Sequence, residues 1–457
     1  MHPPGQLPIW EFESAIPGAA WPALPAPGRA VALALLQQLE TTQWLSAERL
    51  RGLQLRQVEV LLRHAWETSR YYRECWAGRY DPARPLTPEH FACLPLLPRR
   101  DLQQRYEDIK SADPPAAHGT GGETLTSGSM GAPVRALKTQ LTALYWTVFT
   151  LRDHLWHRRD LGDKLAVIRA QLKEGEAADW GAAYKGILTT GPMATLNSGT
   201  VISKQLDWLR RHDPACLLSN ASNAVELARA CLIRGIRLPA LREVRTVSEM
   251  LTVEGRRLIR EAWGVKVTDM YSAEEIGYIA LQCPEHEHYH VQSEGVLLEL
   301  LDQAGAPCAR GQVGRVVVTD LHNFAMPLVR YEIGDYAQAG EPCACGRGLP
   351  VIGGIAGRVR NMLVTAAGER LWPYFGAKQI LEVAPVLQQQ FVQKDYDLIE
   401  ARFVTEAPLD AGQESRLRQL ILSGLPAGMR LQLVYCDRIP RGAGGKYDDF
   451  ICEIDSP

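Results

Sequence analysis

The sequence predicts an α/β protein: a large N-terminal domain with parallel α/β sheets plus a β-subdomain, and a small mobile α+β C-terminal domain. A chain of 457 residues is too long for one hydrophobic core. Strand-like and helix-like segments alternate between residues 165 and 247, as is typical of parallel sheets. We therefore expect an N-terminal domain of residues 1–357, whose β-subdomain covers about 294–357, and a C-terminal domain of residues 358–457.

The first part of the chain predicts an arm followed by helices. Residues 1–45 are rich in Pro, Ala and Gly, so we expect an arm on the surface of the large domain. Apolar residues recur with helical spacing between residues 47 and 79. A turn and a helix start are expected near residues 95–101. The apolar and aromatic run 141–155 predicts a buried helix.

The middle of the chain predicts strands and helices in turn. The expected strands are 165–168, 215–218 and 241–247, and the expected helices are 204–210 and 224–233. In such sheets ligands bind at the carboxyl ends of the strands. Ser248 with Glu249, and the stretch 271–275, each follow a predicted strand, so we expect them at one crevice.

The last third of the chain becomes β-rich and then mixed. Strands 296–301 and 313–319, separated by a Gly-containing turn, predict the β-subdomain. The C-terminal domain is expected to begin with a hairpin over 362–371 that turns at Gly368. Its other expected elements are helices 376–383 and 414–422 and strands 397–404 and 431–434.

Composition and charge exclude several classes of protein. With 46% apolar and 22% charged residues, the chain has the composition of a soluble globular protein. A net charge of −2 gives no general attraction to nucleic acid or to an anionic membrane. The aliphatic run 30–36 is too short to span a bilayer. No basic segment opens the chain, so we expect no signal peptide and a cytoplasmic protein whose ten cysteines form no disulfide framework.

The loop 126–134 offers groups that suit an anion. Gly128 and Gly131 accept backbone conformations closed to other residues, and Thr126, Ser127 and Ser129 add hydroxyls. Such a loop can surround a phosphate with several hydrogen bonds. It is not a Walker loop, because no Gly-Lys-Ser/Thr follows. Taken alone, the same residues also suit a flexible surface loop.

Four further stretches follow this loop in a fixed order: Asp269 to Glu275, Arg330 to Asp335, Gly357 to Asn361 and Pro440 to Lys446. Together the five stretches resemble the adenylate-forming superfamily of acyl-CoA ligases, adenylation domains and luciferases. Val134, where most of the superfamily has Lys, and the sequence Leu-Val-Arg-Tyr at 328–331 resemble its phenylacetate–CoA ligase branch. The resemblance covers roughly Gln57 to Phe450.

The resemblance implies an activity. A carboxylic acid, aromatic in this branch, would react with ATP to an acyl-adenylate with release of pyrophosphate, and the acyl group would pass to CoA. The implied cofactors are ATP, Mg²⁺ and CoA. Two alternatives remain open: transfer to an amine or a carrier-protein thiol in natural-product biosynthesis, and a degenerate homologue that binds nucleotide without catalysis. The sequence leaves the acid, the acceptor and the oligomeric state open, a homodimer included.

The resemblance also assigns roles to the nucleotide-binding residues. The loop residues Thr126, Ser127, Gly128, Ser129 and Gly131 would bind the phosphates. Tyr271 matches the aromatic residue that lies along adenine, Asp335 the acid that binds the ribose hydroxyls, and Glu275 the glutamate associated with Mg²⁺. Ser248 and Glu249, at a neighbouring strand end, join this set.

The C-terminal domain would act as a lid. Arg358 matches an arginine at the hinge that contacts ATP, and Arg360 matches the residue about which the lid rotates. Lys446, on a Gly-rich loop, would bridge the substrate carboxylate and the α-phosphate. Lys446, Arg358 and Glu275 are therefore the expected catalytic residues.

This sequence departs from the pattern of the resembled family near the substrate. Ser272 and Glu274 replace the usual Gly and Thr or Ser, and Glu332 and Ile333 replace the usual Arg and Thr. Glu274 would repel the α-phosphate unless it is paired, points away or recognises a positively charged substrate. With Ser272 and Glu274, the candidates for the substrate pocket are Tyr145 and Trp146, which equally suit core packing.

Cysteines and histidines also gather in two places, Cys343-Ala-Cys345 and the stretch 283–290. Thiolates and imidazoles in fours suit structural zinc. By resemblance to relatives in this branch we expect Cys283, His290, Cys343 and Cys345 as ligands, with His286 or His288 as substitutes. Ordinary reduced cysteines in the β-subdomain are the alternative.

Overall fold

The computed structural model of the chain describes residues 10–126, 133–358, 361–373, 375–442 and 446–454. The chain divides into two compact units. Unit 1 consists of residues 1–162, 180–190 and 270–356, and unit 2 of residues 163–179, 191–269 and 357–457. Some residues singled out from the sequence lie outside the described parts of the chain: Ser127, Gly128, Ser129, Gly131 and Arg360.

Unit 1 begins with helices. They are α1 (Pro27–Thr42), α2 (Ala47–Thr68), α3 (Arg70–Cys75), α4 (Pro88–Ala92), α5 (Arg99–Gln104), α6 (Tyr106–Ile109), a 3₁₀ turn (Ala116–His118) and α7 (Gln140–Trp156). Ser46 caps α2 by accepting a hydrogen bond from the backbone N–H of Arg49. Thr139 and Thr142 form a capping box at the start of α7. The helical pattern 47–79 forms two helices, because Ser69 between them has an extended backbone.

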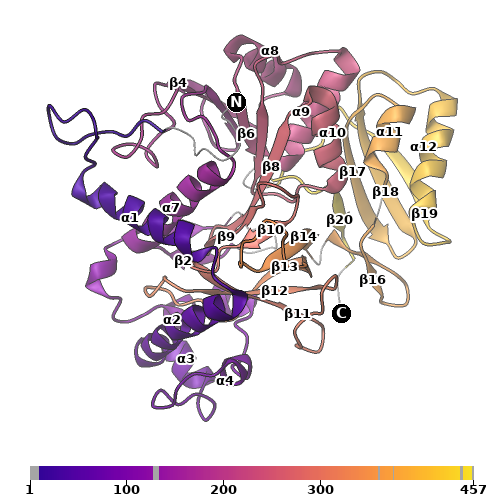
Figure 1. Ribbon diagram of the computed structural model, residues 1–457. Helices are drawn as coiled ribbons and strands as arrows, with labels where there is room; N and C mark the ends of the chain where they lie inside the picture. Colours follow the sequence, from indigo (N-terminus) through magenta and orange to yellow (C-terminus); the bar gives the residue numbers. More distant parts are fainter. Residues whose placement is uncertain (1–9, 127–132, 359–360, 374, 443–445, 455–457) are drawn as a thin grey trace. The chain divides into compact units, whose positions relative to one another are not determined.

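Helix α1 lies inside the segment that the sequence indicated as an arm. The Pro, Ala and Gly content of residues 1–45 gave no sign of it, although Pro27 stands where a helix tolerates proline. Ala32, Leu36 and Leu39 are buried, and α1 packs against α7 (Figure 1).

The sheet of unit 1 is antiparallel. Its strands, in sheet order, are β11 (Val296–Leu301), β12 (Val313–Asp320), β13 (Tyr331–Ala339), β14 (Val351–Arg358), β10 (Tyr289–Val291), β9 (Gly277–Gln282) and the end of β8 (Lys266–Ala273). A separate hairpin joins β1 (Glu123–Leu125) to β2 (Arg135–Leu137). In the antiparallel sheet of unit 1, pairing begins at β8–β9, which is earlier in the chain than the predicted start of the β-subdomain near residue 294.

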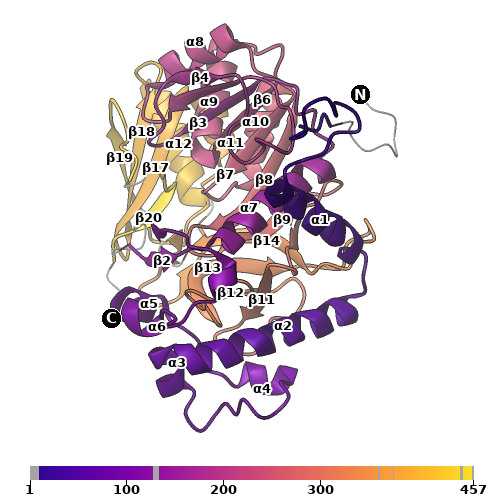
Figure 2. The same cartoon turned by 90° about the vertical axis from the view of Figure 1, so that its left-hand side faces the viewer.

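Helices α2 to α6 lie along this sheet (Figure 2). Val58, Leu61 and Leu62 of α2 are fully buried and belong to one cluster with Leu297 and Val318 of the sheet. This helical spacing is the one that the sequence pattern predicted.

Unit 2 contains the parallel sheet. Its strands, in sheet order, are the start of β8, β7 (Glu243–Val247), β6 (Cys216–Asn220), β3 (Leu165–Arg169), β5 (Met193–Asn197) and β4 (Gly175–Ala177). Only β4 is antiparallel to its neighbour among these strands. The helices are α8 (Ile202–His212), α9 (Ala221–Arg234) and α10 (Val253–Trp263). Gly235 and Gly264 end α9 and α10 with φ of 65° and 67°, which glycine adopts without steric cost.

A second sheet of unit 2 lies within the last part of the chain (Figure 1). Its order is β19 (Arg430–Tyr435), β18 (Leu398–Thr405), β17 (Val386–Asp395) and β20 (Phe450–Cys452). Helices α11 (Ala377–Val383) and α12 (Ala411–Ser423) accompany it, after the hairpin of β15 (Leu363–Val364) and β16 (Arg370–Leu371). Phe391, Phe403 and Leu417 belong to its own core. The sequence did not predict strand β17. It did predict the hairpin turn at Gly368, whose φ is 81°.

A mixed α/β protein with parallel and antiparallel sheet regions confirms the predicted fold class, whereas the domain boundary at 357/358 stays a prediction. Among the described helices, none has the length and apolar character that crossing a bilayer requires.

The buried arginine Arg152 of α7 joins three parts of unit 1. Its guanidinium donates to both carboxylate oxygens of Glu294, at 2.9 and 3.1 Å, to Gln292 Oε1 at 2.9 Å and to the carbonyl of Leu39 in α1. Burial alone would raise the pKa of Glu294, but Arg152 lowers it on balance. This ion pair therefore connects α1 and α7 to the β10–β11 connection.

We expect Arg152→Ala to lower the free energy of unfolding by about 3–5 kcal/mol, because it leaves Glu294 buried without a counter-charge. Urea titration followed by circular dichroism measures the loss. Arg310→Ala is the matched control, since its ion pair with Glu341 at 2.9 Å is exposed and is worth at most about 1 kcal/mol. Equal losses in both variants would contradict the role given to Arg152.

Candidate active site

Glu275, in the turn between β8 and β9, is a buried carboxylate with a fixed counter-charge. Arg99, the first residue of α5, donates from Nη1 to Glu275 Oε1 at 2.9 Å, and the hydroxyl of Tyr331 in β13 donates to the same oxygen at 3.0 Å. The side chains of Arg99 and Glu275 are 12% and 4% exposed, so water does not screen this pair. Burial and the charge of Glu275 raise the pKa of Tyr331, which stays a protonated donor.

The ends of the predicted phosphate loop meet beside this pair. The backbone N–H of Thr126 donates to the carbonyl of Val134 at 2.9 Å, and the N–H of Val134 donates to Thr126 Oγ1 at 2.8 Å. Arg99 Nη2 donates to the same hydroxyl at 3.3 Å. Thr126 thus links Val134 to the guanidinium that pairs with Glu275.

Tyr271 and Asp335, predicted to face adenine and ribose, contact each other. The hydroxyl of Tyr271 donates to Asp335 Oδ2 at 2.8 Å, and both residues are buried. The sequence placed Tyr271 and Ser272 after a strand, which is wrong. Both lie within β8, because pairing with β9 extends this strand to Ala273.

Lys138, just after β2, brings a cation to the same region. Its Nζ donates to the backbone carbonyl of Glu275 at 2.9 Å. Burial lowers the pKa of Lys138, although Asp320, Glu275 and Glu274 oppose that shift. Burial raises the pKa of the Asp320 carboxyl to about 6. The Oδ2 atom of Asp320 is buried without a hydrogen-bond partner among the described residues.

Glu274, the acidic departure from the resembled pattern, is exposed. Thr124 in β1 donates from Oγ1 to Glu274 Oε1 at 2.5 Å. A neutral hydroxyl therefore holds this carboxylate, and its negative charge stays available to a cationic group.

The aromatic candidates on α7 have different surroundings. The ring of Tyr145 stacks on His322 with centroids 4.0 Å apart and an interplanar angle of 11°. Burial raises the pKa of Tyr145 to about 12. Trp146 is 41% exposed and lies 4.3 Å from the ring of Tyr278. An exposed tryptophan packed on a second ring offers an apolar surface, whereas Tyr145 is closer to core packing.

The cysteines and histidines of unit 1 form one cluster. Ligand atoms of Cys283, His288, His290 and Cys343 all lie within 4.8 Å of one another, and Cys345 Sγ is 3.4 Å from His290 Nε2. The Nε2 of His288 is buried without a hydrogen-bond partner among the described residues. Two or three thiols with two imidazoles at this spacing form a donor set that fits a four-coordinate metal.

Ser248 and Glu249 follow β7 in unit 2. Ser248 has a left-handed backbone with φ of 70°, and its Oγ accepts a hydrogen bond from Arg169 at 3.3 Å. Both carboxylate oxygens of Glu249 accept backbone N–H groups: Oε2 from Ser222 at 2.9 Å and Oε1 from Tyr447 at 2.8 Å. The carboxylate expected at the nucleotide is thus bound to the segment that follows Lys446.

Arg358 and Lys446, the other predicted catalytic residues, are both half-buried. Arg358 ends β14, and its backbone N–H donates to Asn361 Oδ1 at 3.3 Å. The carbonyl of Lys446 accepts the N–H of Gly442 at 2.8 Å. This hydrogen bond joins the two described residues that flank positions 443–445.

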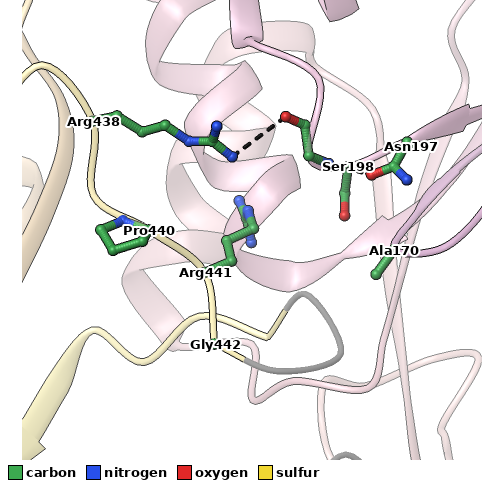
Figure 3. A pocket seen from close by; sticks show the side chains of 8 residues that line it. Ala170, Asn197, Ser198, Arg438, Pro440, Arg441 and Gly442 are labelled. Carbon is green, nitrogen blue, oxygen red and sulfur yellow. Dashed lines mark hydrogen bonds between the residues drawn. The ribbon is translucent and has the colours of Figure 1, made fainter.

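A cavity of about 610 Å³ lies beside this loop in unit 2 (Figure 3). Loops that follow β3 and β5 form one wall, and the segment 438–442 forms the other. Arg438 crosses it, with Nη2 donating to the carbonyl of Gly199 at 3.4 Å. The buried hydroxyl of Ser198 has no hydrogen-bond partner among the described residues. The carboxyl ends of parallel strands are where this class of sheet binds ligands.

Sequence reasoning missed Arg99 and Lys138, and also Arg441 in the segment 438–442. Arg99 stood in a stretch that indicated only a helix start, 176 residues from Glu275. No local pattern marks a partner at such a separation. Arg441 lies in the stretch Pro440 to Lys446, in which the sequence pattern assigned a role only to Lys446.

No protein-family model matches the sequence. The chain is 26% identical over 447 residues to the phenylacetate-coenzyme A ligase of Thermus thermophilus, which covers 90% of this chain and 97% of that one. It is also 26% identical over 431 residues to the phenylacetate-coenzyme A ligase of Pseudomonas putida, with coverages of 90% and 95%.

Solved structures share the fold. A 2-hydroxyisobutyryl-CoA ligase in the postadenylation state, in complex with R3-HIB-AMP, matches with a TM-score of 0.71 and 18% identity over 90% of this chain and 91% of that one. The same ligase in complex with 2-HIB-AMP and CoA in the thioesterification state matches with a TM-score of 0.56 and 21% identity, with the same coverages. The fold is that of the adenylate-forming acyl-CoA ligases. Over most of its length, the chain is similar in sequence to the two phenylacetate-coenzyme A ligases, at 26% identity.

Proposed function

We propose that the protein activates a carboxylic acid with ATP to an acyl-adenylate, releases pyrophosphate and transfers the acyl group to CoA. One observation carries this proposal. The stretches 269–275 and 330–335 meet twice in unit 1, through Tyr271 with Asp335 and through Glu275 with Tyr331. The names of relatives that match 90% of the chain support the same reaction.

Three described residues of unit 1 are proposed to bind the nucleotide. Asp335 is the acceptor for the ribose hydroxyls, since a carboxylate can accept from both. The hydroxyl of Tyr271 holds Asp335 in place, and its ring is the proposed surface for adenine. Thr126, at the start of the stretch that resembles a phosphate-binding loop, would contribute to holding the phosphates.

The chemical difficulty of the first step is to bring two anions together. The substrate carboxylate attacks the α-phosphorus while pyrophosphate leaves, so negative charge develops between them. Lys446 is the proposed cation at this place, and Arg358 a second one near the phosphates. Their charges would stabilise the transition state more than the separate reactants.

Magnesium would accompany the ATP, and Glu275 fits as its carboxylate. Mg²⁺ in nucleotide sites needs one or two carboxylates besides phosphate oxygens and water. Arg99 and Tyr331 both donate to Oε1, so among the described residues no donor reaches Oε2. When bound, the ion would neutralise phosphate charge.

The acid is proposed to be aromatic, with a polar or cationic substituent. Trp146 would cover its ring, and Tyr145, Ser272 and Glu274 would complete the pocket. The hydroxyl-held carboxylate of Glu274 favours an amino-bearing acid over a plain aryl acid.

We further propose structural zinc at the cluster of Cys283, His290, Cys343 and Cys345, with His288 in exchange for Cys345. The short distances between the sulfur and imidazole nitrogen atoms of this cluster support either set of four ligands. The cytoplasmic location and a homodimer stay predictions.

Asp335→Ala is expected to raise the KM for ATP by roughly 10- to 100-fold, because hydrogen bonds to a charged acceptor contribute about 1.5–3 kcal/mol. The KM for the acid should move far less. Tyr271→Phe is the control, since it keeps the ring and removes only the hydroxyl on Asp335; a fewfold change is expected. Equal effects of Asp335→Ala on both substrates would make Asp335 a structural residue.

Lys446→Ala is expected to slow adenylate formation by at least about 10²-fold, the scale of losing one preorganised charge-stabilising donor. ATP–pyrophosphate exchange across a panel of acids measures this step. Thioester formation from synthetic acyl-adenylate and CoA should stay within a fewfold of wild type. Lys394→Ala, which removes an outer lysine paired with Glu453 at 2.7 Å, should change neither step. A parallel loss in both steps would exclude the lid mechanism.

Purified protein is expected to contain about one zinc per chain by elemental analysis. Cys343→Ser should lower both the zinc content and the melting temperature, because metal binding is coupled to folding. Cys308→Ser, a half-buried cysteine of unit 1 outside the cluster, should lower neither. Metal-free protein with full stability would remove zinc from the proposal.

A further inference from the structure

We propose that Glu249 is a positioning residue that holds the backbone of Lys446 in place for adenylate formation, assisted by the Arg441–Glu226 ion pair. The residues concerned, Ser222, Glu226, Glu249, Arg441 and Tyr447, are called the loop anchor below. This inference rests on the proposed function, in which Lys446 acts on the developing charge.

The carboxylate of Glu249 joins two backbone N–H groups of unit 2. Its Oε2 accepts from Ser222, at the start of α9, and its Oε1 accepts from Tyr447. The N–H of Tyr447 belongs to the peptide bond that follows Lys446. A hydrogen bond of 2.8 Å to this group limits where the Cα of Lys446 can lie. Glu249 is buried to more than nine-tenths, with 6% of its side chain exposed.

Arg441 attaches the other end of the same loop. Its Nη2 donates to Glu226 Oε1 at 2.8 Å and its Nη1 donates to Ser222 Oγ at 2.6 Å. The side chains of Arg441 and Glu226 are each 7% exposed. The guanidinium also lies 5.5 Å from the ring centroid of Tyr447. Arg441 is therefore bound directly to the first turns of α9, whereas Tyr447 is linked to them through Glu249.

The described residues Gly442, Lys446 and Tyr447 make further hydrogen bonds near these two attachments. The N–H of Gly442 donates to the carbonyl of Lys446 at 2.8 Å. The hydroxyl of Tyr447 donates to the carbonyl of Gln389 in β17 at 2.5 Å. The backbone of Lys446 is consequently constrained through its own carbonyl and through the N–H that follows.

The chemistry of the loop anchor suits a contact that forms in one step and is released in another. Burial raises the pKa of Glu249, which Arg441 and the N–H donors oppose. Removing one member of a buried ion pair strongly destabilises the protein, because the other charge stays buried without a partner. The intact pair, however, contributes little net stability, because its Coulomb attraction is offset by the cost of removing both charges from water. Such a contact fixes the positions of the groups it joins without a strong net attraction. It can separate when water hydrates the charged side chains again.

A second arginine–glutamate pair on α9 provides a matched control. Arg234, at the other end of α9, binds Glu406 after β18 at 2.7 Å. It also joins α9 to the C-terminal sheet region, but it is remote in sequence from the loop of Lys446. If these ion pairs served only to attach the C-terminal sheet region to α9, removing either pair should lower the activity equally.

The first experiment measures ATP–pyrophosphate exchange of Glu249→Ala, Glu249→Gln and Glu406→Ala. We expect Glu249→Ala to lower kcat by roughly 10- to 100-fold, the scale of misplacing a reacting group by about 1 Å, while the KM for ATP stays within threefold. Glu249→Gln, which keeps an acceptor, should recover part of the loss, and Glu406→Ala should stay within twofold. A rise in the KM for ATP instead would make Glu249 a nucleotide ligand and overturn the inference.

A double-mutant cycle with Lys446→Ala tests whether Glu249 acts through the lysine. In the Lys446→Ala background, Glu249→Ala should cause no further loss, because the group to be positioned is absent. Thioester formation from synthetic acyl-adenylate should be unchanged in every variant. Losses that multiply would overturn the positioning role.

Native tryptic cleavage tests the loop anchor without any activity. The rate of cutting after Lys446, followed by mass spectrometry, should rise in Glu249→Ala and Arg441→Gln but not in Glu406→Ala. Unchanged cleavage would overturn the anchor. If the wild type forms no adenylate with any acid, the proposed function fails, and cleavage still decides whether Glu249 holds the loop.

Discussion

A carboxylate that is buried away from water requires a nearby positive charge. In the candidate site of unit 1, Glu275 is such a carboxylate, and the neighbouring elements supply its partners. Arg99 supplies the charge and Tyr331 a neutral donor, so α5 and β13 meet at the β8–β9 turn. Lys138 binds the backbone of the same residue, which adds β2 to the group. Arg99 also donates to the hydroxyl of Thr126, so the described start of the proposed phosphate-binding stretch lies beside the same ion pair.

Unit 2 uses the same physical principle for a different purpose. Arg441, Glu226 and Glu249 are all nearly excluded from water, yet they connect a Gly-rich loop to a helix rather than two core elements. An apolar contact of similar size would be harder to release. The charged one gives Lys446 a defined position while leaving the loop free to separate, as a two-step adenylation and transfer reaction requires.

The departures from the resembled family concern the substrate more than the nucleotide. Tyr271 and Asp335, which are proposed to bind the nucleotide, contact each other. Glu274 is an exposed carboxylate held by Thr124, Lys138 donates to the backbone of Glu275, and Asp320 has a buried oxygen without a donor among the described residues. Because burying unpaired polar groups is costly, these side chains favour the proposed amino-bearing acid over an unsubstituted aryl acid.

The sequence by itself determined the alternation of strands and helices, the C-terminal hairpin at Gly368 and the five ordered stretches, because these depend on local spacing and turn residues. It also brought Cys283, His290 and Cys343 into one hypothesis. It did not predict α1, whose segment was interpreted as a surface arm because of its Pro, Ala and Gly content, and it did not predict β17. Only the tertiary structure decided that Arg99 faces Glu275, that Thr124 holds Glu274 and that Glu249 binds the residue after Lys446. These contacts join residues more than a hundred positions apart, and a charge reveals its partner only when folding removes the water between them.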